Sequence, residues 1–195
     1  MKTYFPGIAD ADFSRGDVPM TKQEVRILAL AKAKITETDT VIDIGAGTGS
    51  LSVEAGLQAK RGRVFAIERE IAGIELIRSN AEKFGADNIV PILGTAPDAL
   101  ADLPQADVIF IGGSGGRLPA ILAQADALLK TGGRLVVMAI TVETLYHVLE
   151  FMRAKLDYEV EACGVQITRI HPVGASHMLQ GLNPIYIIAG TKGDR

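Results

Sequence analysis

Three alternating glycines mark the place in this chain where a ligand is most expected. Gly45, Gly47 and Gly49 follow the apolar run 40–44, and a segment with helical periodicity begins at Leu51. Glycine permits a tight turn and lets backbone approach a ligand, and the first amides of a helix lie unpaired at its positive end. An anionic or polar ligand is therefore expected between this strand and this helix. The simpler alternative is a strand-to-helix turn that only tolerates glycine.

The spacing of the glycines argues against a dinucleotide. A dinucleotide fingerprint places its third glycine three residues after the second, where this chain has Ser50. An acid, Asp43, lies two residues before Gly45 and completes the pattern Asp-x-Gly-x-Gly-x-Gly. This pattern resembles motif I of class I S-adenosylmethionine-dependent methyltransferases, in which the loop lies against the methionine end of the cofactor.

A second carboxylate, Glu68, directly follows the next apolar run, 63–67. Its two acceptor oxygens suit the two hydroxyls of an adenosyl ribose, and the end of a neighbouring parallel strand would place them beside the glycines. A solvated acid at a strand end is the alternative. Residues 94–100 resemble the loop that lies against the adenine in the same class, and an ordinary loop explains them equally well.

A run of five residues rich in glycine follows the apolar segment 107–111 and comprises Gly112, Gly113, Ser114, Gly115 and Gly116. Amino-methylating enzymes of the class carry Asn or Asp with Pro-Pro-Tyr at this place, so N-methylation is not expected here. Open space and backbone N–H groups at such a run predict contact with a large or polyanionic substrate. A flexible loop without a ligand is the alternative.

These loops connect elements that alternate regularly along the chain. Short β-rich runs occupy 40–44, 63–67, 88–93, 107–111 and 134–138, and helical patterns occupy about 21–34, 50–60, 70–84, 117–129 and 142–154. Continuously apolar strands that alternate with helices predict a parallel sheet with helices on both faces. The runs 159–170 and 184–189 have no helix between them and are expected to pair as an antiparallel edge of that sheet.

Local signals predict where three of the helices begin or end. Thr21 and Glu24 have the spacing of a capping box, with Thr21 as the N-cap of the first helix. Gly85 follows one helical pattern, and Gly132 and Gly133 follow another, as left-handed residues after a helix end often do.

Length and composition predict one domain over residues 1–195, with residues 1–20 as an amino-terminal extension. The 20 basic and 23 acidic residues give a formal net charge of −3, too even for a phosphate-dominated nucleic-acid binder or a polybasic membrane protein. No apolar run approaches a membrane span, and no secretory signal precedes Asp10. One cysteine, Cys163, excludes an internal disulfide and favours a reducing, cytoplasmic compartment.

The remaining reactive side chains predict no metal site. His171 and His177 are six residues apart in an expected loop, which matches no zinc template, and His147 lies inside a helical pattern. One of the loop histidines, Arg117 or Arg169 could instead bind a substrate carboxylate. No acid/base pair stands out, so no catalytic residue is assigned.

Three segments together resemble one family. They are residues 18–26 ahead of the glycine motif, Ile111 to Gly116, and residues 177–184 near the end of the chain. In these segments the chain resembles the T-type precorrin methyltransferases of cobalamin biosynthesis, the decarboxylating C15-methyltransferases that act on cobalt-precorrin-6B. The resemblance extends from about Gly7 to Ala189. Its more specific parts are Pro-x-Thr-x-x-Glu-Val-Arg, which begins at Pro19, and the Gly-Gly-Ser-Gly-Gly loop.

The resemblance implies a fold, a cofactor and a reaction. The fold would be the class I methyltransferase α/β fold, a seven-stranded, mostly parallel sheet with an antiparallel last strand. The site for S-adenosyl-L-methionine would comprise Thr21, Asp43, Gly45, Ala46, Gly47, Thr48, Gly49, Glu68 and Ala96. A corrinoid precursor would gain a methyl group at C15 and lose carbon dioxide from its C12 acetate, with the conjugated macrocycle as electron sink.

The resemblance also implies a homotetramer and a separate C5-methyltransferase partner. Two other functions stay open at this point. One is a different class I methyltransferase, acting on isoaspartyl residues, ribosomal RNA or a small molecule. The other is a nucleotide-binding module without catalysis.

Overall fold

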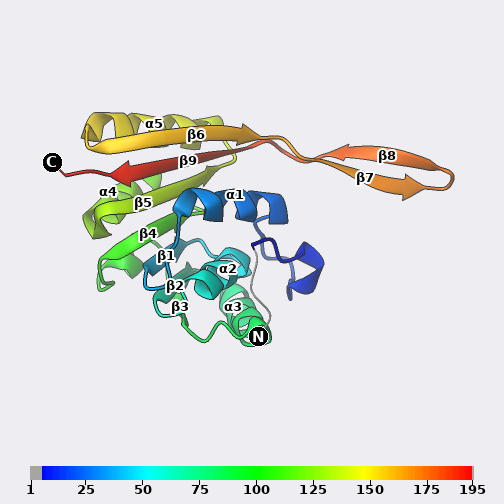
Figure 1. Cartoon of the computed structure of the whole chain (residues 1–195), viewed down its shortest axis with the longest axis horizontal. Coiled ribbons are helices and arrows are strands. Elements are labelled where there is room, and N and C mark those ends of the chain that lie inside the picture. Colours follow the sequence, from blue (N-terminus) through cyan, green and yellow to red (C-terminus); the bar gives the residue numbers. More distant parts are fainter. Residues whose placement is uncertain (1–5, 195) are drawn as a thin grey trace.

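The computed structural model describes residues 6–194; the first five residues of the expected extension and Arg195 lie outside them. A seven-stranded sheet has the order β3-β2-β1-β4-β5-β9-β6, and a separate pair, β7 and β8, projects from it (Figure 1). The strands of the sheet are β1 (Thr40–Ile44), β2 (Arg63–Glu68), β3 (Ile89–Leu93), β4 (Ala106–Ile111), β5 (Leu129–Ala139), β6 (Tyr158–Val165) and β9 (Ile185–Lys192).

The expected α/β fold is confirmed. Strands β1 to β5 pair in parallel, and the last strand, β9, lies antiparallel between β5 and β6. Ile44 at the end of β1 is in register with Ile67 of β2 and Ile111 of β4. The loops that follow these three strands therefore meet at one edge of the sheet, where ligands bind in open α/β folds.

Helices cover both faces of the sheet. Alternate side chains of a strand point to opposite faces, so Val41 packs with α1 and α2, whereas Ile42 and Ile44 pack with α4 and α5. The third helix, α3, packs against Ala66 on the face that carries α1 and α2. The helices are α1 (Gln23–Ala33), α2 (Ser50–Gln58), α3 (Ile71–Phe84), α4 (Leu118–Leu128) and α5 (Val142–Lys155).

The predicted antiparallel pairing of 159–170 with 184–189 is confirmed for β6 and β9, but the run 159–170 is not one strand. Strand β6 ends at Val165, and the chain then leaves the sheet as a hairpin of β7 (Thr168–Val173) and β8 (Ser176–Gly181). Leu182 N donates to Ile167 O at 2.9 Å, which closes the hairpin before Pro184. Proline has no N–H to continue a ladder, so β9 starts only after it. The hairpin projects from the edge at which the parallel strands end (Figure 1).

The capping-box prediction at Thr21 is also wrong. Helix α1 begins at Gln23 after Lys22, which provides no side-chain cap, and the Gln23 N–H donates to Asp10 Oδ1 at 2.9 Å. A carboxylate of the amino-terminal segment thus takes the place of the hydroxyl. Gly85 does end α3 in the left-handed conformation. Gly132 and Gly133 instead lie within β5, because α4 has already ended at Leu128 and the chain pairs with the sheet from Leu129 onward.

The described residues contain no helix with the length and apolar character needed to cross a membrane.

Candidate active site

Backbone hydrogen bonds tie the site loops together at the carboxyl edge of the sheet. Gly45 N and Ala46 N both donate to Ile67 O at 3.0 Å, which joins the glycine motif to β2. Gly112 N donates to Ile44 O at 2.9 Å, which joins the glycine-rich loop 112–116 to β1. The glycine motif and the loop 112–116 are therefore held together at this edge.

The glycines of the motif are required by close packing. Gly45, Gly47 and Gly49 have φ values of 76°, 57° and 75°, a region that side chains disfavour. A Cβ at Gly45 would lie 2.8 Å from Gly113 N, and a Cβ at Gly47 would collide with the carbonyl oxygen of Pro19. The close approach at Gly47 thus comes from the amino-terminal segment. The turn therefore packs against loop 112–116 at Gly45 and against the amino-terminal segment at Gly47.

The carboxylate of Glu68 is held beside the motif and is only 8% exposed. Its Oε2 accepts the Gly47 N–H at 2.9 Å, and its Oε1 accepts the N–H groups of Arg69 and Glu70 at 2.9 and 3.0 Å. The structure therefore excludes a freely solvated acid at the strand end. Each carboxylate oxygen can accept more than one hydrogen bond, so Glu68 keeps capacity for a ligand hydroxyl.

Asp43 is buried on the α2 side of β1. Ser52 Oγ donates to its Oδ2 at 2.5 Å. Burial raises the pKa of Asp43 to about 6; the hydrogen bond from Ser52 opposes this rise, and the negative charge of Glu68 adds to it. Because burial penalises the charged form, the side chain carries its proton over a wider pH range than an exposed aspartate does.

Asp43→Asn should flatten the dependence of stability on pH. Between the ordinary value of 3.8 and about 6 the folded protein holds a proton on Asp43 that the unfolded chain releases. This contribution to the free energy of unfolding is present below 3.8 and is lost as pH rises through 6, by roughly 3 kcal/mol at most. Urea unfolding of both proteins from pH 4 to 7 should show the variant losing less stability; parallel curves would contradict the assignment.

The glycine-rich loop offers space more than hydrogen-bond donors. Gly112 N and Gly113 N both point at Ile44 O, at 2.9 and 3.4 Å, so the expectation that these two N–H groups serve a substrate is not supported. A Cβ at Gly113 or Gly116 would meet no atom within 4 Å. Arg117, directly after the loop, forms a two-pronged ion pair with Asp98 at 2.8 and 3.2 Å.

The other expected cofactor residues occupy different surroundings. Thr48 is fully buried, and its Oγ1 has no hydrogen-bond partner among residues 6–194. Ala96 packs into the hydrophobic core on the α4 side. In the same loop, Gly94 N donates to Glu68 O at 2.9 Å. Thr21 accepts a hydrogen bond from Arg26 with its carbonyl oxygen, and within residues 6–194 its side chain makes no hydrogen bond to the motif.

These observations fit S-adenosylmethionine better than a dinucleotide. The N–H groups of Gly45, Ala46, Gly47 and Gly49 all donate within the protein, which leaves few donors for a pyrophosphate. The carboxylate of Glu68 and the open space beside Gly113 remain for a ligand with hydroxyl and amino groups.

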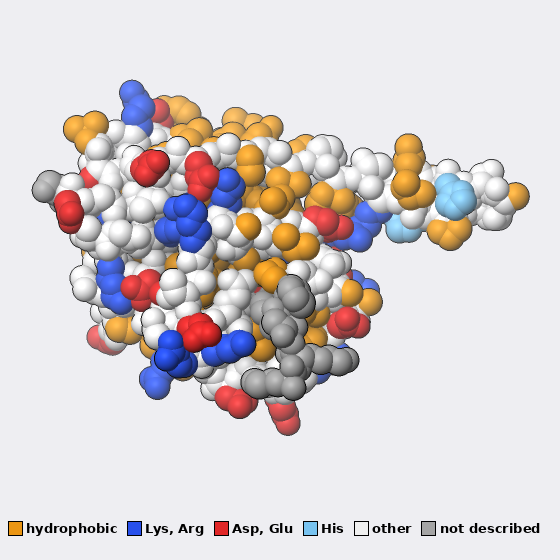
Figure 2. All heavy atoms as spheres, viewed as in Figure 1, with side chains coloured by type: hydrophobic (Ala, Val, Ile, Leu, Met, Phe, Trp, Pro, Cys, Tyr) orange, Lys and Arg blue, Asp and Glu red, His pale blue; other side chains and the backbone are white. Residues whose placement is uncertain are grey.

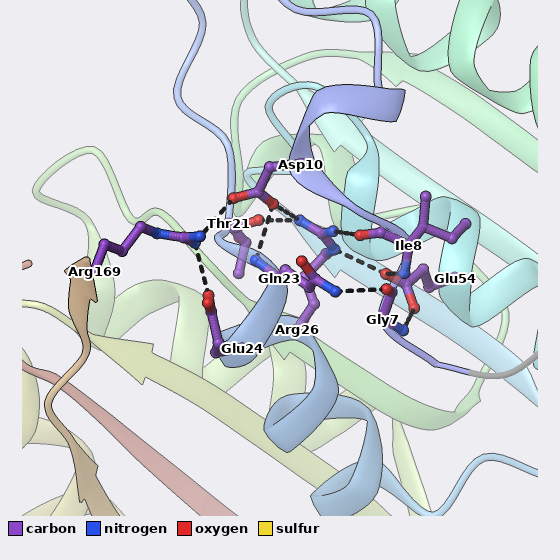
Figure 3. Close-up of polar contacts among 9 residues, drawn as sticks. All are labelled: Gly7, Ile8, Asp10, Thr21, Gln23, Glu24, Arg26, Glu54 and Arg169. Atoms are coloured by element: carbon purple, nitrogen blue, oxygen red, sulfur yellow. Dashed lines mark hydrogen bonds and ion pairs between the residues drawn. The ribbon is translucent and has the colours of Figure 1, made fainter. Parts of the chain in front are cut away.

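A buried ion-pair network around Arg26 was not predicted from the sequence (Figure 3). Arg26 is fully buried; its Nε donates to Glu54 Oε1 and its Nη1 to Asp10 Oδ1, each at 2.9 Å. Glu54 Oε2 also accepts the Gly7 N–H at 2.7 Å. The network fastens the amino-terminal segment, whose Pro19 lies against the motif, to α1 and α2. The spacing of α1 could have indicated that Arg26 is buried. Arg26 precedes Ala29, Leu30 and Ala33 by three, four and seven residues, so it lies on the apolar face of the helix.

The three histidines and the cysteine lie outside the glycine motif and the loop 112–116. His171 and His177 lie on the projecting hairpin, and no group of three potential metal ligands occurs within residues 6–194. Cys163 on β6 is half-buried and packs against the core.

The sheet order and the motif define the class I S-adenosylmethionine-dependent methyltransferase fold. A solved S-adenosylmethionine-dependent O-methyltransferase from Thermotoga maritima has this fold, with a TM-score of 0.73 and 19% identity over 90% of this chain and 68% of that chain. The family is more specific. The model of the precorrin methyltransferase domain matches residues 12–192, and the chain belongs to that family.

Two relatives span almost the whole chain. A curated protein from Salmonella typhimurium, cobalt-precorrin-6B C(15)-methyltransferase (decarboxylating), is 40% identical over 94% of this chain and 95% of its own length. The solved precorrin-6y C5,15-methyltransferase from Geobacter metallireducens is 39% identical, with a TM-score of 0.89, over 95% of this chain and 98% of that chain. These matches favour a precorrin methyltransferase over the isoaspartyl, ribosomal RNA and nucleotide-module alternatives.

Proposed function

We propose that this protein methylates C15 of cobalt-precorrin-6B and releases the C12 acetate carboxyl group as carbon dioxide, with residues 1–195 acting as one methyltransferase domain. The observation that carries the proposal is the contact of the motif with loop 112–116, in a chain that matches the precorrin methyltransferase model. A Cβ at Gly113 would meet no atom within 4 Å, and this open space suits a bulky acceptor.

The cofactor of this reaction is S-adenosyl-L-methionine, which supplies the methyl group when bound. The residues proposed to hold it are Thr21, Asp43, Gly45 to Gly49, Glu68 and Ala96. Glu68 would accept the ribose hydroxyls, and the motif would lie against the methionine end. Methyl transfer is an in-line displacement, so holding both reactants aligned and excluding water supplies much of the rate enhancement without a strong base.

The direct test is incubation with cobalt-precorrin-6B and S-adenosylmethionine, followed by mass analysis of the product. The proposal expects a product with one added methyl group and one carboxyl group fewer. Methylation without decarboxylation, or no product from a folded protein that binds the cofactor, would contradict it. Methylation at C5 is assigned to a separate partner protein, so C5 should remain unmethylated. The expected compartment is the cytoplasm.

Glu68→Ala should weaken the binding of S-adenosylhomocysteine by roughly 1–3 kcal/mol, the range of hydrogen bonds to charged groups. Part of this loss reflects the motif itself, since Gly47 N–H would lose its acceptor. Glu70→Ala is the control, because its exposed carboxylate pairs only with exposed Arg69 in the described structure. Calorimetry measures both affinities; an unchanged affinity for Glu68→Ala would remove Glu68 from the site.

We also propose that the chain forms a homotetramer and that the β7–β8 hairpin is the surface through which it assembles. An isolated two-stranded hairpin is marginally stable in water, and this one has both edges unpaired within residues 6–194. Ile170 and Leu179 face each other across the hairpin and are 64% and 67% exposed. Hydrophobic side chains follow the hairpin along its length (Figure 2).

Replacing both of these residues by aspartate should lower the mass of the assembly in solution. Two negative charges would then lie where the hairpin is proposed to pack against another subunit. Light scattering coupled to gel filtration measures the mass. Leu156→Asp is the matched control: this residue is 92% exposed, lies after α5 and should leave the mass unchanged. A wild-type protein that is monomeric at all concentrations would contradict the proposal.

A further inference from the structure

A groove of about 410 Å³ lies between the amino-terminal segment, the start of α1 and the base of the hairpin. Its lining includes Asp10 and Arg15 from the segment, Lys22 before α1, and Arg169, His171 and Gln180 from the hairpin. We call it the basic groove. It is formed by parts of the chain that are far apart in sequence, and Figure 3 shows Arg169 reaching from the hairpin to Asp10 and Glu24.

The charge of the basic groove is positive because its acids are already paired. Asp10 Oδ1 accepts from Gln23 N and Arg26 Nη1, and Arg169 Nη2 lies 3.5 Å from Asp10 Oδ2 and 2.9 Å from Glu24 Oε2. By contrast, no carboxylate within residues 6–194 pairs with Arg15 or Lys22. Arg15 and Lys22 therefore line the groove without a carboxylate partner among residues 6–194. Cationic side chains without a carboxylate partner favour the binding of an anion.

The hairpin is arranged to present its polar face to the groove. Arg169 lies opposite Gln180 in the β7–β8 ladder, and His171 follows two residues later on the same face. The intervening Ile170 lies opposite Leu179 on the other face. The face that carries Arg169, His171 and Gln180 lines the groove, whereas Ile170 and Leu179 lie on the opposite face.

One short segment contributes both to the groove and to the packing of the motif. Pro19 packs its carbonyl oxygen against Gly47, and Lys22, three residues on, lines the groove. A ligand larger than the groove can therefore place one end in it and another part at the carboxyl edge of the sheet. A macrocycle whose rim carries several carboxylate side chains has that size and that charge.

We propose that the basic groove binds carboxylate side chains of the tetrapyrrole-derived substrate, with Arg15 and Lys22 as the principal ligands. The proposal rests on the proposed function for the identity of the ligand. It makes these two residues determinants of substrate affinity and leaves cofactor binding to the motif and Glu68.

The test uses Arg15→Gln, Lys22→Gln and the double variant, with cobyrinic acid and its fully esterified, uncharged counterpart as probes. Calorimetry should show that the wild type prefers the acid, and that the double variant binds the acid at least about tenfold more weakly while the ester is unaffected. Affinity for S-adenosylhomocysteine should not change. Lys60→Gln is the matched control, since Lys60 is exposed beyond the end of α2 and away from the groove.

Turnover separates this inference from the proposed function. With cobalt-precorrin-6B, the variants should raise KM and leave kcat nearly unchanged, and Lys22→Arg should retain the wild-type KM. Product formation with an unchanged KM in the double variant would overturn the groove assignment and leave the function intact. Binding of cobyrinic acid that depends on Lys22, in a protein that makes no product, would support the groove and overturn the function. If the double variant does not fold, the single variants decide by the same criteria.

Discussion

Arg26→Met should lower the free energy of unfolding by about 3–5 kcal/mol, the range seen when one partner of a buried ion pair is removed. Methionine fills a similar volume, so the main loss is electrostatic. Glu54 would lose the guanidinium 2.9 Å from its Oε1, and Asp10 would lose its contact with Nη1. Phe13 would also lose the cation 4.8 Å above its ring. Urea unfolding at neutral pH measures the difference.

A surface pair provides the control for this effect. Arg61 and Glu37 are 3.2 Å apart with side chains 70% and 60% exposed, so Arg61→Met should cost less than about 1 kcal/mol. The buried network should in addition couple to the site, because it holds the segment whose Pro19 lies on Gly47. Arg26→Met is therefore expected to weaken S-adenosylhomocysteine binding as well. A loss for Arg26→Met no larger than that for Arg61→Met would show that the network does not secure the segment.

The sheet and its helices could be predicted because their signals are local. Runs such as Val108 to Ile111 are apolar on both faces, as strands buried between helix layers must be. The hairpin could not be predicted in the same way. Residues 168–181 show no regular alternation of polar and apolar side chains and bury no face in the chain, so nothing local distinguishes a strand pair there from a loop.

The site was predictable where it depends on backbone geometry and not where it depends on contacts distant in sequence. The positive φ angles of Gly45, Gly47 and Gly49 follow from the motif. The strand-end position of Glu68 follows from the apolar run 63–67. The acceptor for the Gln23 N–H is Asp10, thirteen residues away, and the partner of Arg26 is Glu54. A capping box is a statement about four consecutive residues, so a carboxylate brought in by the tertiary fold replaced it without a signal in that window.

Gly113→Val should abolish methylation and decarboxylation together while thermal stabilisation by S-adenosylhomocysteine persists. The added Cβ meets no atom within 4 Å and Gly113 is not in the left-handed region, so the fold has room for valine. The branched side chain would fill the space where the macrocycle is expected, next to the Gly45 turn. Thr131→Val is the control, because Thr131 is exposed near the start of β5, at the opposite edge of the sheet from the site loops.

The pattern of losses in Gly113→Val assigns the loop to one part of the site. Loss of turnover with cofactor binding intact places the 112–116 loop against the acceptor, since the motif and Glu68 are untouched. Loss of cofactor binding in a folded variant would place Gly113 in the methionine pocket, which its backbone contact with Gly45 makes geometrically close. Full turnover would show that the space beside Gly113 is solvent. The acceptor would then have to approach the motif from the side of Pro19 and Lys22, where the groove variants would carry the larger effect.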